Sequence, residues 1–283
     1  MHSFRSLSGW IVCCLLVVST LSPSANQDNK IIISSQEETA QDVAQVSCKE
    51  TQRLSAVKAL FIKMGARAEN LLIEKRDGVE NLVIRKPSNL QGIIVIGAHY
   101  DKLMVGCGAI DNWTGIVALA HIYRSLKDVP LQKTLLFVAF GKEEEGLLGS
   151  KAMVNNIKKE EMGQYCAMIN IDSLGMAAPQ VAENLSSKAL VNRVVEIAQR
   201  MKVPFSKLKI PGAGADSLSF IEKRIPAVTI SALGEGWEEV LHTRHDQVGK
   251  VNQTSVYLGY RLALALVTEL DNLPCEVSRE KAK

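Results

Sequence analysis

Histidine and carboxylate side chains follow short apolar runs at several places in this 283-residue chain. The residues concerned are His99 and Asp101, Asp111, the run Glu143 to Glu145, Asp172, and His242. In open α/β sheets, ligands bind just beyond the carboxyl ends of the strands. If the apolar runs are strands of one sheet, these side chains are candidates for a common site.

Each of these segments alone has an ordinary structural explanation. A histidine at the end of a strand is usually a surface residue, an aspartate before a helix is usually an N-cap, and a run of glutamates is usually a solvated face. Several together at one edge of a sheet are different, because gathered carboxylates repel one another unless a cation compensates them. The combination therefore predicts a metal site.

The residue types also indicate which metal the site would hold. Histidine and carboxylate without thiolate suit zinc or a similar divalent ion in a catalytic site. One ligand from each of the five segments would make five ligands, which are too many for one tetrahedral zinc that must keep a position open for water. They suit two ions that share a bridging carboxylate and lie about 3.5–4 Å apart.

The elements that would position these residues follow from the hydrophobic pattern. Short apolar runs alternate with longer amphipathic segments, as expected for strands buried on both faces and joined by helices. We expect strands at residues 93–98, 134–140, 166–171 and 227–231, and helices at 114–127, 147–155, 188–202, 216–224 and 253–272. A helix over 41–65 and a hairpin of 71–73 with 82–84 precede them. The predicted fold is a three-layer α/β/α sandwich with a mostly parallel, mixed central sheet.

The N-terminus has the layout of a secretory signal peptide over residues 1–25. His2 and Arg5 precede an apolar run at 10–21, which is short for a membrane span of about 20 residues, and small residues follow it. We therefore expect a secreted, periplasmic or otherwise exported protein with no stable membrane span after signal removal; an uncleaved anchor is the alternative. We expect residues 26–40 to form a polar, loosely ordered lead-in, and residues 41–283 to form a single domain that carries the candidate site.

Composition narrows the class of protein further. With 47% hydrophobic and 22% charged residues, the chain can bury a substantial core, and a net charge of +3 without a long basic block gives no reason to expect a nucleic acid partner. Four cysteines lie outside the signal segment, and they allow three full disulfide pairings that the sequence does not rank. They are Cys48, Cys107, Cys166 and Cys275. We interpret Cys166, beside an apolar run, as a buried core thiol.

Taken together, five motifs resemble those of the M28 peptidases, a family of co-catalytic zinc aminopeptidases that is distantly related to glutaminyl cyclases. The motifs are GAHYD at 97–101, GAIDNWTG at 108–115, EEEGLLGS at 143–150, NID at 170–172 and LHTRHD at 241–246. Their order and spacing span most of the catalytic domain. The resemblance implies a zinc-peptidase fold, two Zn²⁺ per chain, and removal of the N-terminal residue from peptides or proteins with a free N-terminus.

The resemblance also implies a role for each matching residue. The metal ligands would be His99, Asp111, Glu144, Asp172 and His242. Asp111 would bridge the ions, with His99 and Asp172 on one, and Glu144 and His242 on the other. Glu143 would be the general base, and Asp101 would accept a hydrogen bond from the second ring nitrogen of His99. From spacing we expect Asp246 to serve His242 in the same way.

Several alternatives stay open at this point. His245 competes with His242 as the ligand, and His121 lies inside an amphipathic helix, where we expect it to pack. Some relatives carry an aromatic hydroxyl and a cysteine pair just ahead of the position of Asp216, whereas this chain has residues 212–214 reading GAG. A glutaminyl cyclase-like enzyme with a single zinc, a dipeptidase or carboxypeptidase, and a metal-free peptidase-like binding protein are the competing functions. Metal stoichiometry helps to separate them.

Overall fold

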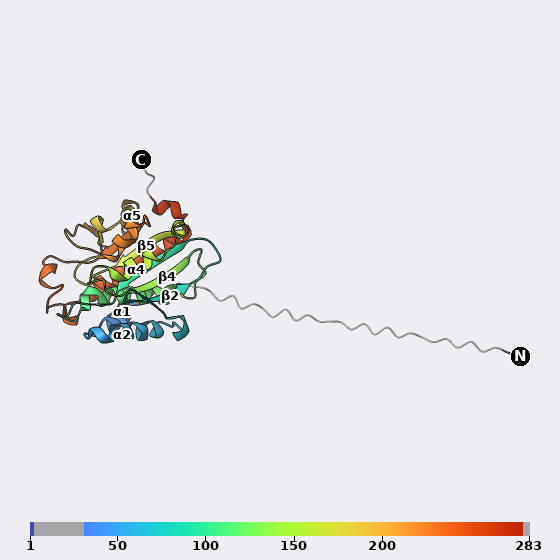
Figure 1. The fold of residues 1–283 in the computed structure, drawn as a ribbon, viewed down its shortest axis with the longest axis horizontal. Coiled ribbons are helices and arrows are strands. Elements are labelled where there is room, and N and C mark those ends of the chain that lie inside the picture. Colours follow the sequence, from blue (N-terminus) through green and yellow to red (C-terminus); the bar gives the residue numbers. More distant parts are fainter. Residues whose placement is uncertain (3–30, 280–283) are drawn as a thin grey trace.

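The computed structural model describes residues 1–2 and 31–279, and its centre is an eight-stranded mixed sheet. The strand order is β1-β2-β4-β3-β5-β8-β6-β7, and Figure 1 labels β2, β4 and β5 of this sheet. The strands are β1 Leu72–Arg76, β2 Val79–Lys86, β3 Ile93–His99, β4 Thr134–Phe140, β5 Tyr165–Ile171, β6 Gln180–Ala182, β7 Ser206–Leu208 and β8 Ala227–Ser231. Strands β4, β3, β5 and β8 run parallel, whereas β2 and β6 pair antiparallel to their inner neighbours.

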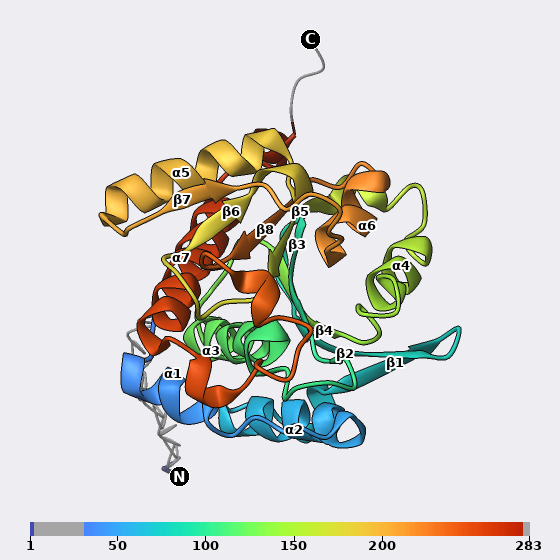
Figure 2. The ribbon, with the colours of Figure 1, turned by 90° about the vertical axis from the view of Figure 1, so that its left-hand side faces the viewer.

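Helices cover both faces of this sheet. They are α1 Gln36–Val43, α2 Glu50–Lys63, α3 Thr114–Leu126, α4 Leu148–Asn155, α5 Lys188–Met201, α6 Asp216–Glu222 and α7 Gln253–Asn272. Helices α4 and α6 lie on one face, and the other helices lie on the opposite face (Figure 2). The predicted three-layer α/β/α sandwich is therefore confirmed.

The central strands have helix layers on both sides, which explains their unbroken apolar sequences. All seven residues of β4 are buried, and six of seven are buried in both β3 and β5. Because β3 lies between β4 and β5, the carboxyl ends of the three strands meet at one edge of the sheet. This edge is where the sequence placed the candidate ligands.

The N-terminal region is ordered earlier than the sequence suggested. Ser34 is buried, and Ser35 closes a capping box on α1. The Ser34 amide donates to the Tyr260 hydroxyl at 3.1 Å, and the buried His121 ring lies between Ser34 Oγ at 2.7 Å and Asp42 Oδ2 at 3.1 Å. The expectation of a polar lead-in up to residue 40 is thus wrong from Ser34 onward, because these polar side chains find buried partners on α3 and α7. His121 packs inside α3 as expected.

The predicted helix over 41–65 is in fact two helices, α1 and α2, joined by a connecting segment. We call residues 34–63, which include both helices and this segment, the N-terminal arm. The connecting segment carries Cys48, which is bonded to Cys107. The second disulfide joins Cys166 to Cys275. Cys166 is buried, but its interpretation as a core thiol is wrong, because its partner comes from the segment after α7.

The predicted signal peptide at 1–25 falls almost wholly within residues 3–30, outside the described part of the chain, and it stays a prediction. Among the helices of residues 31–279, none combines the length and the apolar character that crossing a bilayer requires.

Candidate metal centre

The structure brings all five predicted ligands together at the carboxyl edge of the sheet. His99 ends β3, Glu144 and Asp172 follow β4 and β5, Asp111 lies in the turn before α3, and His242 lies in the loop after β8. These side chains form two groups, and within each group the candidate ligand atoms lie within 4.8 Å of one another. One group is His99, Asp111 and Asp172, and the other is Asp111, Glu144 and His242. Asp111 is common to both groups.

The carboxylate of Asp111 lies between two histidines. Its Oδ1 is 3.0 Å from Nε2 of His99, and its Oδ2 is 3.0 Å from Nε2 of His242. On the outer sides, Asp172 Oδ1 is 3.8 Å from His99 Nε2, and Glu144 Oε2 is 3.4 Å from His242 Nε2. Each half of the site therefore offers one imidazole and one carboxylate in addition to Asp111.

Backbone geometry orients Asp111 away from a regular helix. Its φ and ψ are −112° and 95°, and the peptide bond to Asn112 is cis. The fully buried Asn112 side chain donates to the Ile171 carbonyl at 2.9 Å and accepts from the Gly115 and Ser173 amides at 3.0 and 3.1 Å. Asn112 thus fixes the turn that carries Asp111 to the segment that carries Asp172.

Asp101 has a broader set of contacts than the sequence indicated. The Nδ1 atom of His99 lies 3.2 Å from the Asp101 carbonyl and 3.5 Å from its Oδ1. The same carboxylate accepts the backbone N–H groups of Glu143 at 3.0 Å and Glu144 at 3.1 Å. Asp101 therefore connects His99 to the two glutamates.

Asp246 does not serve His242, so that expectation is wrong. Its carboxylate accepts the N–H groups of Ile110 at 2.7 Å and Asp111 at 3.1 Å, and it stabilises the turn that bears Asp111. Backbone amides are satisfied by tertiary partners that residue spacing does not reveal. The alternative ligand His245 is exposed and belongs to neither group.

The carboxylates of the site are short of positive charge. Burial, with the neighbouring carboxylates Asp216, Asp172 and Asp111, raises the pKa of Glu143 to about 10. Burial and Asp111 raise the pKa of Glu144 to about 7. Against its burial, the pKa of Asp111 is held low by hydrogen bonds from His242 and His99. A divalent cation fits this set of imidazole and carboxylate donors, and zinc is the metal that such donors favour.

Asp216 is a site residue whose state the sequence did not predict. It is fully buried at the start of α6, and among the described residues neither of its carboxylate oxygens has a hydrogen-bond partner. Burial raises its pKa to about 7. An aspartate in the first turn of a helix is common, so the local sequence carries no signal that this one is buried close to His99 and Asp172.

A cavity of about 270 Å³ opens beside Asp172 and His242. Most of its lining is apolar, and the residues include Leu185, Ile210, Pro211, Ala213, Leu233, Trp237 and Leu241. An apolar side chain of moderate size fits a pocket of this volume and lining.

The sequence is similar to those of known metallopeptidases. The model of Peptidase family M28 matches residues 81–267. Aminopeptidase YwaD of Bacillus subtilis is 30% identical over 203 residues, which cover 67% of this chain and 44% of that protein. The chain thus spans less than half the length of this curated relative.

Solved structures with the same fold include peptidases and cyclases. The structure described as BSAP, a zinc aminopeptidase from Bacillus subtilis, superposes with a TM-score of 0.61 at 26% identity, covering 67% of this chain and 49% of that one. A glutaminyl cyclase of an Acidobacteriales bacterium superposes with a TM-score of 0.72 at 14% identity, covering 88% and 99%. At 14% identity, the second likeness shows the fold alone.

Proposed function

Because this chain belongs to peptidase family M28, we propose that it is a zinc aminopeptidase that hydrolyses the N-terminal peptide bond of peptides or proteins with two zinc ions. The observation that carries the proposal is the position of Asp111, with His99 on one side of its carboxylate and His242 on the other, each at 3.0 Å. The naming of YwaD and BSAP as aminopeptidases supports the activity, and that of BSAP as a zinc enzyme supports the metal.

The residues that would hold the ions are those of the two groups. His99 and Asp172 would bind one ion, Glu144 and His242 would bind the other, and Asp111 would contact both. Bound zinc supplies a Lewis acid that polarises a peptide carbonyl and lowers the pKa of water.

Glu143 would move the proton. Its carboxylate faces the site, with Oε2 4.0 Å from His99 Nε2, and its backbone amide is fixed by Asp101. A nearby cation stabilises the ionised form of a buried carboxyl, so Glu143 would be a base in the loaded enzyme. It would take a proton from the attacking water and deliver it to the leaving amine.

The cavity beside Asp172 and His242 suggests the substrate class. We expect it to receive the side chain of the first residue, and its apolar lining with Ile210 and Trp237 favours an apolar one. Burial of an apolar side chain in such a pocket contributes about 25 cal/mol to the free energy of substrate binding for each Å² of apolar surface removed from water.

The test compares two neighbouring glutamates. Glu143→Gln should retain its zinc and lose about 10²- to 10⁴-fold in kcat on a panel of aminoacyl substrates. Glu145→Gln is the matched control, because Glu145 is exposed and pairs only with Lys142 among its described neighbours. Undiminished turnover in Glu143→Gln would refute the assignment. Near one zinc per chain together with cyclisation of N-terminal glutamine would identify a cyclase instead.

Export from the cell remains part of this proposal. The pairing of all four cysteines outside the expected signal segment supports an oxidising compartment. The N-terminal sequence of the mature protein tests it, with cleavage near residue 25 as the expected result.

A further inference from the structure

We propose that Arg53 and the Cys48–Cys107 disulfide form a brace through which the N-terminal arm positions the metal-binding turn at Asp111. This inference rests on the proposed function. The arm lies wholly outside the segment that matches the family model, residues 81–267, yet its buried contacts run to the loop between His99 and Asp111. Arg53 would be a positioning residue, because it touches backbone near the ligands and none of their side chains.

Arg53 joins the two ends of this loop. Its Nε donates to the Tyr100 carbonyl at 2.9 Å, and its Nη2 donates to the Gly108 carbonyl at 2.7 Å. Its Nη1 reaches the Ser47 carbonyl of the arm itself at 3.3 Å. One rigid guanidinium thus spans the backbone directly after His99 and the backbone where the Asp111 turn begins.

The environment of Arg53 is unusual for an arginine. The side chain is fully buried, and no carboxylate of the described residues forms an ion pair with it. Burial lowers its pKa to about 10, so it stays charged at neutral pH. Its partners are carbonyl oxygens and the face of Trp113, with Cζ 5.5 Å from the ring centroid. The negative charges of Glu50, Asp246, Asp111 and Asp101 favour its charged form, while two of its three hydrogen bonds go to backbone carbonyls of the loop that carries Asp111. The side chain is therefore placed to hold the backbone of that loop in position.

The loop backbone fits closely around the guanidinium. Gly108 has a φ of 62°, and a Cβ at that position would lie 2.8 Å from Nη2 of Arg53. The Gly108 carbonyl also accepts from the Trp113 amide at 3.2 Å. Displacement of Arg53 would therefore remove the shorter of the two hydrogen bonds to this carbonyl, at the start of the turn that contains Asp111.

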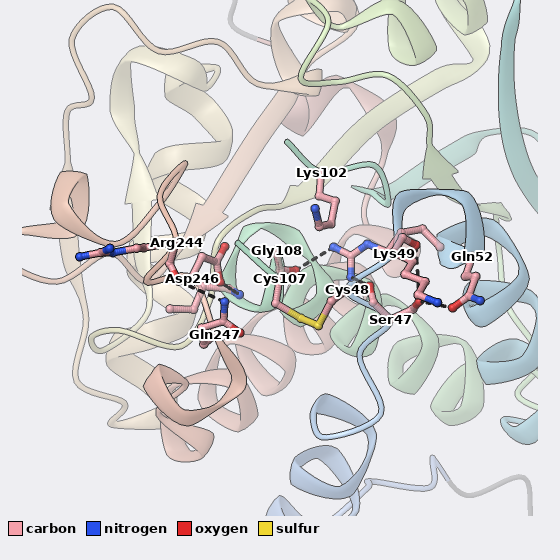
Figure 3. Close-up of a disulfide and its surroundings, with 12 residues drawn as sticks. Ser47, Cys48, Lys49, Gln52, Lys102, Cys107, Gly108, Arg244, Asp246 and Gln247 are labelled. Carbon is pink, nitrogen blue, oxygen red and sulfur yellow. Dashed lines mark hydrogen bonds between the residues drawn. A yellow bond between two sulfur atoms is a disulfide. The ribbon is translucent and has the colours of Figure 1, made fainter. Parts of the chain in front are cut away.

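The disulfide adds a covalent contact at the adjacent residue. Figure 3 shows Cys48 of the arm bonded to Cys107, beside Gly108 and Asp246. The Cys107 amide donates to the Asp246 carbonyl at 2.8 Å, and the Asp246 carboxylate in turn accepts the Asp111 amide at 3.1 Å. The turn is held between the arm and the loop that follows His242.

The competing explanation is that these contacts stabilise the fold and nothing more. The two explanations differ in what they predict for the metal. Residues that orient ligands change metal affinity about 10- to 100-fold when altered. A contact that only stabilises the fold lowers the unfolding midpoint and leaves the zinc affinity of the folded protein unchanged.

The first experiment compares two arginines that both fix the arm. Arg53→Lys keeps the positive charge but loses the planar guanidinium that donates to the Tyr100 and Gly108 carbonyls together. Arg124→Gln breaks the contact of Arg124 with Glu38 on α1, away from the loop. We expect Arg53→Lys to weaken zinc binding about 10-fold or more in chelator competition and to lower kcat with KM nearly unchanged, since the arm does not line the substrate cavity. Arg124→Gln should unfold more readily and bind zinc like the unmodified chain. Equal zinc affinities in the two variants would overturn the proposal.

The second experiment uses the two disulfides as matched controls and stays informative if Arg53→Lys fails to fold. The double variant Cys48→Ser with Cys107→Ser should lose zinc affinity and exchange the amides of residues 102–111 faster. The double variant Cys166→Ser with Cys275→Ser should show neither effect. If both pairs affect zinc equally, the brace is refuted. Zinc affinity and amide exchange report on the brace even if the chain proves to have no aminopeptidase activity, so the two proposals can fail separately.

Discussion

The two ends of the central sheet handle buried charge in opposite ways. At the amino end, Lys133 precedes β4 and donates from Nζ to the carbonyls of Asp271 at 2.7 Å and Leu273 at 2.6 Å. The Asp271 carboxylate accepts the Gln132 and Lys133 amides at 3.0 and 2.8 Å. At the carboxyl end, Asp111, Glu143, Glu144 and Asp172 converge, and the buried Asp216 has no hydrogen-bond partner among the described residues.

The difference separates a structural end from a functional one. Charges that are satisfied within the chain contribute to stability, whereas carboxylates that repel one another lower it until a cation binds. Local conflicts of this kind are expected where a site is built at the expense of stability. Substitutions at the two ends should therefore affect different measurements.

The largest contrast is expected between two aspartates. Asp111→Asn removes the negative charge that the two groups share and should weaken zinc binding by at least about 100-fold. This loss of affinity exceeds the roughly 10- to 100-fold that is typical when a residue that only orients a ligand is changed. Asp271→Asn should leave zinc binding unchanged and lower the free energy of unfolding by about 1–3 kcal/mol, because the buried Lys133 amide and the part-buried Gln132 amide lose a charged acceptor. Zinc titration and urea unfolding of both variants check this. A loss of zinc affinity in Asp271→Asn would break the distinction between the ends.

Removal of the metal should reveal the conflict as a pH dependence. The pKa of Glu144 is raised to about 7, so above pH 5 the unfolded chain releases a proton that the folded metal-free chain retains. The hydrogen bond between His242 and Asp111 raises the pKa of His242 to about 9. The stability that this interaction gives the folded chain is complete below pH 6.5 and is lost by about pH 9. Both effects have the same sign, so metal-free stability should fall between pH 5 and pH 9.

The size of this fall is bounded by linkage. Each proton held only by the folded state changes the free energy of unfolding by about 1.4 kcal/mol per pH unit. Urea midpoints measured from pH 5 to pH 9 should decline in the chelator-treated protein and stay nearly level in the zinc-loaded protein. Parallel profiles for the two forms would contradict the contrast.

The sequence predicted the central strands and the carboxyl end of the sheet better than its edge strands and its amino end, for a physical reason. Strands buried on both faces have continuous apolar runs, so β3 was placed within one residue, and the ligands follow where such runs stop. The three-residue strands β6 and β7 were missed, because edge pairing and not an apolar run forms them. The Cys166–Cys275 pairing at the amino end depends on where α7 ends in space, which spacing does not encode.

Within the site, the grouping of the candidate ligands was predictable from the sequence, and the contacts that hold them in place were not. His99 and Asp172 carry their chemistry in their residue type and their place after a strand. The contacts of Asp246 and Arg53 are to backbone groups, which every residue has, so no pattern of residue types identifies the partner. Such contacts follow only from the packed structure.

The last expected effect concerns a single carboxyl, that of Asp216, and it tests the comparison most directly. Because burial raises its pKa to about 7, Asp216 is protonated in the folded metal-free chain at pH 5 and ionised at pH 9. Above about pH 4 the unfolded chain is ionised, so the carboxyl lowers folded stability progressively as pH rises to 7. Asp216→Asn removes that pH dependence, so we expect its effect on the stability of the metal-free protein to be more favourable at pH 9 than at pH 5, by up to about 3 kcal/mol at about 1.4 kcal/mol per pH unit between pH 5 and pH 7. Urea unfolding at the two pH values measures the difference. Destabilisation at pH 9 like that of Asp271→Asn would mean that Asp216 is satisfied in solution, and the two ends of the sheet would then treat a buried carboxylate alike.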